Sequence, residues 1–147
     1  MGDFKLPSVT VDAIIEDESK VLLIRRKGKT FHGFLALPGG YVDYGEAVEN
    51  AVVREVKEEV GLEALPKAIL GVYSAPERDP RGHVISIVFI VEALGDPIAG
   101  DDASDFEWVK LEELEQMDLA FDHGLVLKDY VKWKEENQTF WSLKKRV

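Results

Sequence analysis

Residues 40–62 read GYVDYGEAVENAVVREVKEEVGL, and this stretch indicates how the chain is organised. Positions 47–60 contain neither glycine nor proline, so they favour an uninterrupted helix. Gly61 follows directly, and glycine often ends a helix because it tolerates a left-handed backbone. The stretch therefore predicts a helix that runs over residues 47–60 and ends beside Gly61.

Carboxylates and valines share one face of this predicted helix. At about 100° per residue, Glu55 and Glu59 project within roughly 40° of each other and close to Val48, with Glu58 to one side. Like charges three and four residues apart repel each other, and a bound cation would remove that repulsion. Three carboxylates near glycine backbone therefore predict an all-oxygen site for Mg²⁺, with Mn²⁺ as a second choice. The alternative is that these glutamates only form a solvated surface.

Strand patterns lie on both sides of the predicted helix. Upstream, residues 9–16 and 20–26 predict a hairpin around 17–19, and residues 34–37 predict a short strand that ends in a turn at 38–40. Downstream, strands are expected at 67–75, 83–93 and 106–109, a helical turn at 111–117, and a second helix at 122–136. Together these elements indicate an α/β fold with mixed layers.

The composition limits the classes of function. A chain of 147 residues that is 46% hydrophobic suits one domain, which we expect to span residues 1–147. It shows neither an apolar run long enough to span a membrane nor a secretory signal pattern, so we expect a cytoplasmic protein that binds no membrane. The lack of cysteine excludes disulfides, thiolate zinc sites and a cysteine nucleophile. A net charge of −10 disfavours extended nucleic acid as a partner, whereas a divalent cation on clustered carboxylates still permits a small phosphorylated substrate.

The stretch 40–62 also resembles the Nudix box, G-x5-E-x7-R-E-U-x-E-E-x-G-U, in which U is an aliphatic residue. Every fixed position is filled, from Gly40 through Glu46 and Arg54 to Leu62. The resemblance extends to the hairpin, to the segment at 37–40 and to the later strands. It implies the Nudix fold, an α/β/α sandwich around a mixed β-sheet, and a hydrolase that cuts the pyrophosphate linkage of a nucleoside diphosphate derivative.

The same resemblance implies roles for individual residues. The implied metal ligands are the carbonyl of Gly39 and the side chains of Glu55, Glu58 and Glu59. Arg54 and Glu46 would orient the helix and its preceding loop through salt bridges. The acidic loop at 100–105 is expected to supply a further base or ligand, which we assign to Asp102, with Asp101 and Asp105 as alternatives. Catalysis would rest on positioning and charge stabilisation, without a covalent enzyme intermediate.

The choice of substrate has to be read outside the box. Residues 71–83 resemble the corresponding segment of ADP-ribose pyrophosphatases, including Pro76, and residues 119–123 resemble relatives directed at ADP-ribose. Arg78 and Arg81 are predicted to clamp phosphate or ribose oxygens, and Arg26 to reach the substrate from the hairpin. The alternative for each arginine is a plain surface charge. Residues predicted to stack on adenine, or otherwise to fill the core, are Phe34, Tyr41, Phe106 and Trp108.

These observations predict an enzyme that hydrolyses ADP-ribose to AMP and ribose 5-phosphate. One alternative is a pyrophosphatase for oxidised or non-standard nucleoside triphosphates. Another is a non-catalytic module that senses ADP-ribose, although such a module would be expected to lose the metal-binding glutamates. Bulky apolar residues at 139–143 indicate either packing on the domain or contact within a homodimer.

Overall fold

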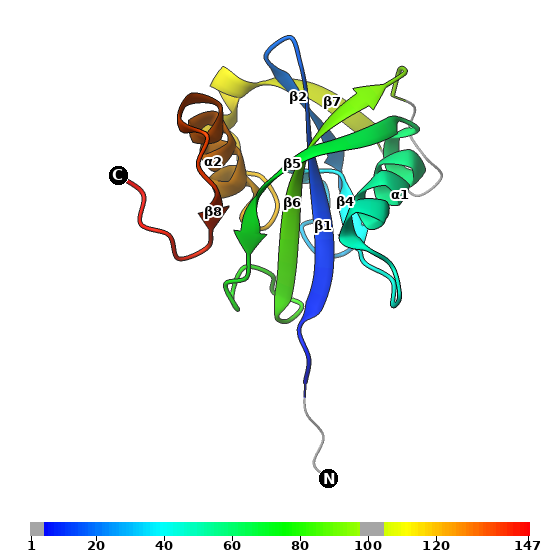
Figure 1. Cartoon of the computed structure of the whole chain (residues 1–147), viewed down its shortest axis with the longest axis vertical. Helices are drawn as coiled ribbons and strands as arrows, with labels where there is room; N and C mark the ends of the chain where they lie inside the picture. Colours follow the sequence, from blue (N-terminus) through cyan, green and yellow to red (C-terminus); the bar gives the residue numbers. More distant parts are fainter. Residues whose placement is uncertain (1–4, 98–104) are drawn as a thin grey trace.

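The structure is a computed structural model that describes residues 5–97 and 105–147. It consists of a mixed β-sheet with helices on both faces (Figure 1). The elements are β1 (Ser8–Asp17), β2 (Lys20–Arg25), β3 (Leu35–Ala36), β4 (Gly39–Tyr41), α1 (Val48–Val60), β5 (Glu63–Tyr73), β6 (Val84–Leu94), β7 (Asp105–Lys110), the 3₁₀ helix η1 (Leu111–Gln116), α2 (His123–Glu136) and β8 (Phe140–Trp141). The predicted α/β architecture is confirmed.

Strand β1 lies at the centre of the sheet. It pairs parallel with β6 and antiparallel with β2 and β4, and the strands follow the order β3-β2-β1-β6-β5-β8. Strand β7 adds to the sheet by pairing with β2. Because β1 has neighbours on both sides, its residues are almost continuously buried, which explains why they read as an apolar run.

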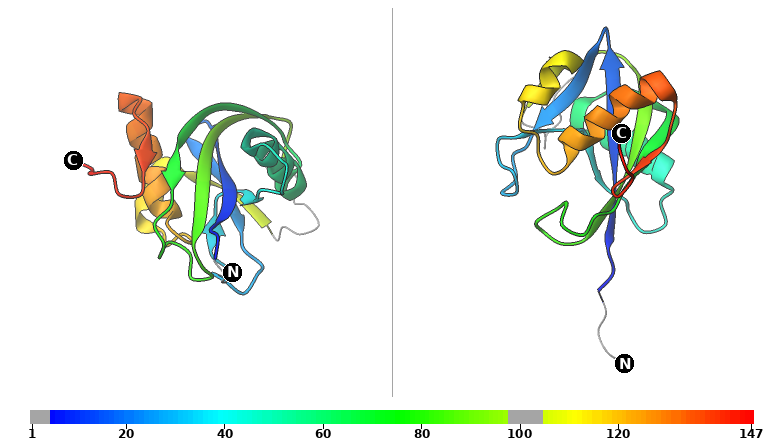
Figure 2. Two further views of the ribbon diagram at one scale, coloured as in Figure 1. Left: turned by 60° about the horizontal axis from the view of Figure 1, so that its bottom comes forward. Right: turned by 90° about the vertical axis from the view of Figure 1, so that its left-hand side faces the viewer.

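Helices α1 and α2 lie on opposite faces of the sheet (Figure 2), and a hydrophobic core lies under each of them. On one face, Val11 and Ala13 of β1 pack with Val52 and Val56 of α1. On the other face, Ile14 joins a core that includes residues of α2 and η1. The alternation of side chains along β1 therefore separates the two helices into different layers.

The predicted helix is confirmed almost to the residue. Helix α1 runs from Val48 to Val60, and its last turn ends at Gly61, which has φ 70° and donates its N–H to the carbonyl of Lys57. The predicted hairpin, the turn that became η1 and the second helix are also present. Strand β5 begins four positions earlier than predicted, at Glu63, and pairs with β6 through two irregularities in register.

One prediction about the local backbone is wrong. Residues 38–40 were expected to form a turn, but Gly39 and Gly40 belong to β4 and pair with β1. Glycine is needed at position 39 for close approach and not for a turn, because a Cβ there would lie 2.1 Å from the carbonyl oxygen of Val11. The strand therefore presses directly against the centre of the sheet.

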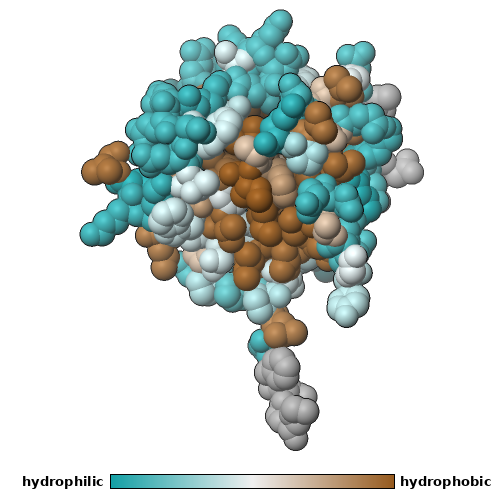
Figure 3. Space-filling model, in the orientation of Figure 1, coloured by the Kyte–Doolittle hydropathy of each residue, from teal (hydrophilic) through white to brown (hydrophobic). Residues whose placement is uncertain are grey.

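The apolar tail packs only in part. Phe140 is buried against β5, whereas Trp141 is 50% exposed. On β5, Ile69 and Val72 are 45% and 41% exposed, and Figure 3 shows apolar side chains gathered on this side of the molecule. Across the described ranges 5–97 and 105–147, no helix is both long and apolar enough to cross a membrane.

Candidate functional site

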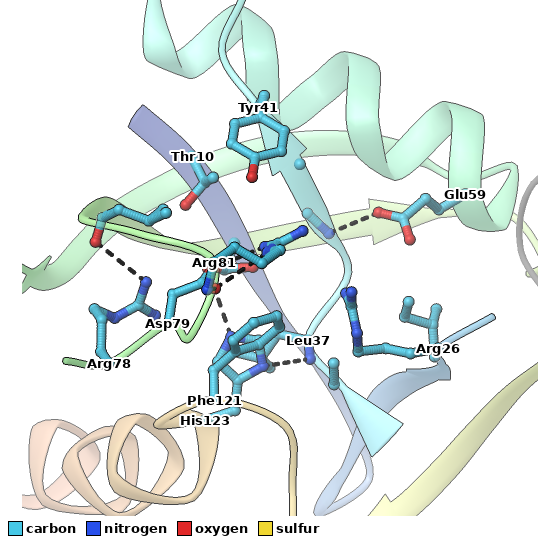
Figure 4. Close-up of a pocket in the computed structure, with 16 residues that line it drawn as sticks. Thr10, Arg26, Leu37, Tyr41, Glu59, Arg78, Asp79, Arg81, Phe121 and His123 are labelled. Atoms are coloured by element: carbon cyan, nitrogen blue, oxygen red, sulfur yellow. Dashed lines mark hydrogen bonds and ion pairs between the residues drawn. The ribbon is translucent and has the colours of Figure 1, made fainter. Parts of the chain in front are cut away.

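A pocket lies where β1, β4, the end of α1, the loop before β6 and the start of α2 meet (Figure 4). Its polar lining residues are Thr10, Asp12, Arg26, Tyr41, Glu59, Arg78, Asp79, Arg81 and His123. Carboxylates and guanidinium groups therefore line the same cavity, so it can accept a ligand that carries both anionic groups and a bound cation.

Glu59 and Glu55 lie against β4. The Glu59 carboxylate accepts a hydrogen bond from the N–H of Gly39 over 2.7 Å, and the Glu55 carboxyl group lies beside Gly40, where a Cβ would come within 2.4 Å of it. Burial raises the pKa of Glu59 to about 8, and the nearby charge of Glu55 adds to the rise. Burial also raises the pKa of Glu55, although Arg54 opposes the shift. The carboxylates of Glu55 and Glu59 are therefore close to each other in an environment with little access to water.

Arg54 connects the acidic residues to one another. Its guanidinium donates to Glu46 at 2.8 Å, to Glu55 at 2.8 Å and to Glu58 at 3.2 Å, and it also reaches the carbonyl of Tyr41. Arg54 and Glu46 form a salt bridge with each other, a contact of the kind expected to orient the loop and the helix. The hydrogen bonds from Arg54 lower the pKa of Glu46 to about 2. Arg54 fixes the loop before α1 against the helix.

The chemistry of these residues fits a hard divalent cation. Glu55 and Glu59 offer carboxylate oxygens, and burial raises the pKa of both, so that the protein alone stabilises their anions poorly. The lack of a Cβ at Gly40 leaves room for the Glu55 carboxyl group. The side chain of Glu58 is 58% exposed and contacts Arg54. Within the part of the chain that the structure describes, no three acidic or imidazole groups already converge on one point. Glu58 would have to turn toward its neighbours to join a shared ion.

Two arginines and two aromatic rings line the same pocket as Glu59, whereas Glu55 and Glu58 lie outside its lining. The guanidinium of Arg81 lies between the rings of Tyr41 and Phe121, 5.6 Å and 5.3 Å from their centroids (Figure 4). Arg26 lies 4.8 Å from the Phe121 ring. Asp79 holds Arg81 through hydrogen bonds of 2.8 Å and 3.1 Å, which raise the pKa of Arg81. We call Arg26 and Arg81 the cationic wall of the pocket; Asp79 pairs with Arg81 and fixes its position.

The other predicted substrate residues are placed differently. Arg78 lines the pocket but is buried, and it donates to both carboxylate oxygens of Asp122, so its charge is already paired. Pro76 is exposed and lies outside the lining. Phe34 packs edge-on against Phe31 and is also outside the lining. The structure does not bring Pro76 and Phe34 to the cavity in this conformation.

Of the remaining aromatic predictions, Phe106 and Trp108 pack against the core under α1, which supports their alternative role as core residues. Asp105 begins β7. The predicted Asp102, together with Asp101, lies outside the described residues.

Among the polar and aromatic residues of the lining, sequence reasoning assigned no individual role to Thr10, Asp12, Asp79, Phe121 or His123. Asp12 carried a usable signal, because it is a single acid inside the apolar run of β1. Burial alone would raise its pKa, but His123 and Ser86 beside it lower the pKa overall. Asp122 occupies the N-cap position of α2, yet its side chain makes no capping hydrogen bond and holds Arg78 instead.

Comparisons with known proteins identify a family. The sequence profile of the NUDIX domain matches residues 6–130. An ADP-ribose pyrophosphatase of Methanocaldococcus jannaschii is 57% identical over 129 residues, which cover 87% of this chain and 75% of that enzyme.

Two solved structures share the fold. The NUDIX domain of Shewanella oneidensis NrtR, crystallised with ADP-ribose, is 31% identical with a TM-score of 0.76, and the match covers 88% of this chain and 89% of that one. A bifunctional NMN adenylyltransferase/ADP-ribose pyrophosphatase of Francisella tularensis, crystallised with AMP and a manganese ion, is 27% identical with a TM-score of 0.80. That match covers 89% of this chain and 43% of the bifunctional protein.

Proposed function

Because this chain belongs to the Nudix family, we propose that it is a pyrophosphohydrolase that converts ADP-ribose to AMP and ribose 5-phosphate. The observation that carries the proposal is the pocket in which Glu59 faces the cationic pair Arg26 and Arg81. The negatively charged oxygens of a pyrophosphate need positive groups close to them, and the two arginines supply part of that positive charge. The relative that is 57% identical is an ADP-ribose pyrophosphatase, which supports the same substrate.

The divalent ion that this family generally requires is proposed to be Mg²⁺, with Mn²⁺ as a substitute. Glu55, Glu58, Glu59 and the carbonyl of Gly39 would hold it. The chemistry that such an ion supplies is neutralisation of the pyrophosphate and a lowered pKa for an attacking water.

The chain's own residues prepare the site in three ways. Arg54 keeps Glu55 directed at β4, and Glu46 keeps Arg54 in place. The N–H of Gly39 orients Glu59. These contacts fix the carboxylates before substrate binds, so little reorganisation is needed during the reaction.

On the substrate side, we propose that Arg81 and Arg26 bind the diphosphate and ribose oxygens. Tyr41 and Phe121 orient Arg81 for these contacts, because its guanidinium lies over the faces of both rings. Arg78 serves this wall indirectly, because its pairing with Asp122 ties the loop before β6 to the start of α2. Direct contacts from Pro76 and Phe34, and a base or ligand at Asp102, remain predictions.

The test is a substrate panel. Purified protein with Mg²⁺ or Mn²⁺ would be offered ADP-ribose, other dinucleotides and nucleoside triphosphates, and the products would be separated by chromatography. We expect AMP and ribose 5-phosphate from ADP-ribose. If the protein released AMP from other dinucleotides while leaving ADP-ribose intact, the substrate assignment would be wrong.

Two alternatives are separated by the same panel. A triphosphate pyrophosphatase would release inorganic pyrophosphate and a nucleoside monophosphate. A sensor would bind ADP-ribose without turnover. Retention of Glu55, Glu58 and Glu59 favours catalysis over sensing.

We also propose that the protein forms a homodimer and acts in the cytoplasm. The homodimer is supported by Ile69, Val72 and Trp141, which leave an apolar surface exposed beside β5. Analytical ultracentrifugation of the wild type and of Trp141→Glu tests this: a dimer should dissociate in the variant, whereas a wild-type monomer at micromolar concentration would contradict the proposal.

A further inference from the structure

Leu37 occupies a gap between two strands. Strand β3 ends at Ala36 and β4 begins at Gly39, so the N–H of Leu37 lies outside both ladders. Leu37 is 2% exposed, and a buried N–H without an acceptor is strongly unfavourable. The acceptor is Nδ1 of His123, 3.0 Å away and 86 positions later in the chain.

This hydrogen bond defines the state of the His123 ring. An imidazole nitrogen that accepts an N–H carries no proton, so the neutral ring is protonated at Nε2. Nε2 faces Asp12, whose Oδ2 lies 3.7 Å away, and Ser86 donates its hydroxyl to the same carboxylate oxygen. Asp12 thus favours the tautomer that leaves Nδ1 free to accept. His123 is itself only 3% exposed, so its orientation is fixed by packing.

The segment that follows Leu37 carries the carboxylate site. The carbonyl of Pro38 accepts the N–H of Ala13 over 2.8 Å, and the N–H of Gly39 donates to Glu59. The segment at 37–39 is therefore held at three successive residues, and His123 supplies the first of these contacts. A shift at Leu37 would be passed to Gly39 and from there to the Glu59 carboxylate.

The first turn of α2 also reaches a second wall of the pocket. Asp122, the neighbour of His123, pairs with Arg78 in the loop that carries Arg81. Asp122 and His123 therefore attach the loop that carries Arg81 and the segment at 37–39 to the same end of α2.

From these contacts we infer that His123 is a positioning residue for the reaction. Its Nδ1, by accepting the N–H of Leu37, sets the position of Gly39 and so aligns Glu59 with the cationic wall. The inference rests on the proposed function for its kinetic consequence. Its structural part concerns the protein alone.

The structural part is tested first by NMR on uniformly ¹⁵N-labelled protein, without substrate. The chemical shifts should show an unprotonated Nδ1 and a protonated Nε2 for His123, and the Leu37 amide should exchange slowly with solvent. A protonated Nδ1, or a rapidly exchanging Leu37 amide, would overturn the inference whatever the substrate proves to be.

The kinetic part compares two substitutions. His123→Leu removes the acceptor but keeps an apolar side chain, whereas His123→Asn places an amide oxygen near the position of Nδ1. We expect His123→Leu to lower kcat by roughly 10- to 100-fold, the range typical when an orienting contact behind a site is lost. KM should change less than kcat, because Arg26 and Arg81 are themselves not substituted. His123→Asn should recover most of kcat.

A matched control is Tyr73→Phe. It removes the buried hydrogen bond from Tyr73 to Asp129, which lies away from the pocket lining. The control should lower the melting temperature while leaving kcat unchanged. The inference fails if folded His123→Leu keeps wild-type kcat, or if His123→Asn is as slow as His123→Leu. If ADP-ribose is not the substrate, the same comparison is made with whichever compound the panel identifies, so failure of the proposed function is recognised separately.

Discussion

The backbone N–H of Gly39 donates to the Glu59 carboxylate over 2.7 Å, which joins two residues 20 positions apart. This contact ties the last turn of α1 to β4 and brings a buried acid to the edge of the pocket. Because burial and Glu55 raise the pKa of Glu59 to about 8, the carboxylate is poorly stabilised as an anion by the protein itself. A bound cation would stabilise it.

Glu59→Gln should nearly abolish turnover while leaving the fold intact. The amide keeps the size of the side chain but loses the charge that a divalent ion requires, so we expect kcat to fall by roughly 100-fold or more. Release of AMP gives the rate, and circular dichroism verifies folding. The matched control is Glu63→Gln, which alters an exposed glutamate paired with Lys57. Full activity in Glu59→Gln would remove this carboxylate from the mechanism.

Removal of divalent ions should stop the reaction and lower stability. A ligand that binds only the folded state raises its stability by mass action, and here it would also relieve repulsion between Glu55 and Glu59. Thermal unfolding with EDTA and then with excess Mg²⁺ should show a higher melting temperature with the ion. The increase should be smaller in Glu59→Gln. Equal increases in both proteins would mean that Mg²⁺ binds elsewhere.

Alanine substitutions at two adjacent glycines should have different effects, one mainly on stability and the other mainly on activity. In Gly39→Ala the new Cβ meets the backbone oxygen of Val11 at 2.1 Å, so we expect a loss of roughly 1–3 kcal/mol of stability or more. In Gly40→Ala the Cβ meets the Glu55 carboxyl group, a flexible end that can move. That variant should fold but lose activity, by up to roughly 100-fold, because Glu55 is displaced. Urea unfolding and kcat measure the two effects, and equal destabilisation of both variants would contradict this reading.

The stability of the folded protein should depend on pH because of Glu46. Arg54 lowers its pKa to about 2 from an ordinary value of 4.5, so the ionised form is favoured in the folded state. This contribution is fully present above about pH 5 and is lost as the pH falls toward about 2. Unfolding should therefore show a wild-type advantage over Glu46→Gln that shrinks across this range. Glu113→Gln, at an exposed position on η1, is the control, and a difference that is constant with pH would refute the assignment.

Arg81→Lys should affect substrate binding more than the rate of the chemical step. Lysine keeps the charge but loses the planar group that lies between Tyr41 and Phe121 and the paired contact with Asp79. We expect KM for ADP-ribose to rise roughly 10-fold, the scale of one lost charged hydrogen bond, with a smaller change in kcat. Arg146→Lys makes the same exchange at a remote ion pair with Asp129 and should not alter KM. An unchanged KM in Arg81→Lys would exclude a binding role.

Local patterns were sufficient for much of the fold. The periodicity of residues 47–60 and the glycine after them located α1, since helix formation and termination depend on neighbouring residues. Alternating and apolar runs located the strands for the same reason. The face shared by Glu55 and Glu59 could also be read from helical geometry alone. The prediction of a turn at 38–40 was wrong because glycine is required at position 39 by the close approach of β1, which is distant in the sequence.

The sequence by itself determined the elements, the acidic face of α1 and the chemistry that the face suits. The tertiary structure alone decided which distant groups meet there. Asp122 takes the charge of Arg78, His123 reaches Leu37, and Arg81 lies between two rings. Such contacts join residues brought together by sheet topology and by the docking of α2, and no local spacing records them. The physical reason is that helix periodicity is a short-range property, whereas the pairing of buried polar groups is settled only when the layers pack.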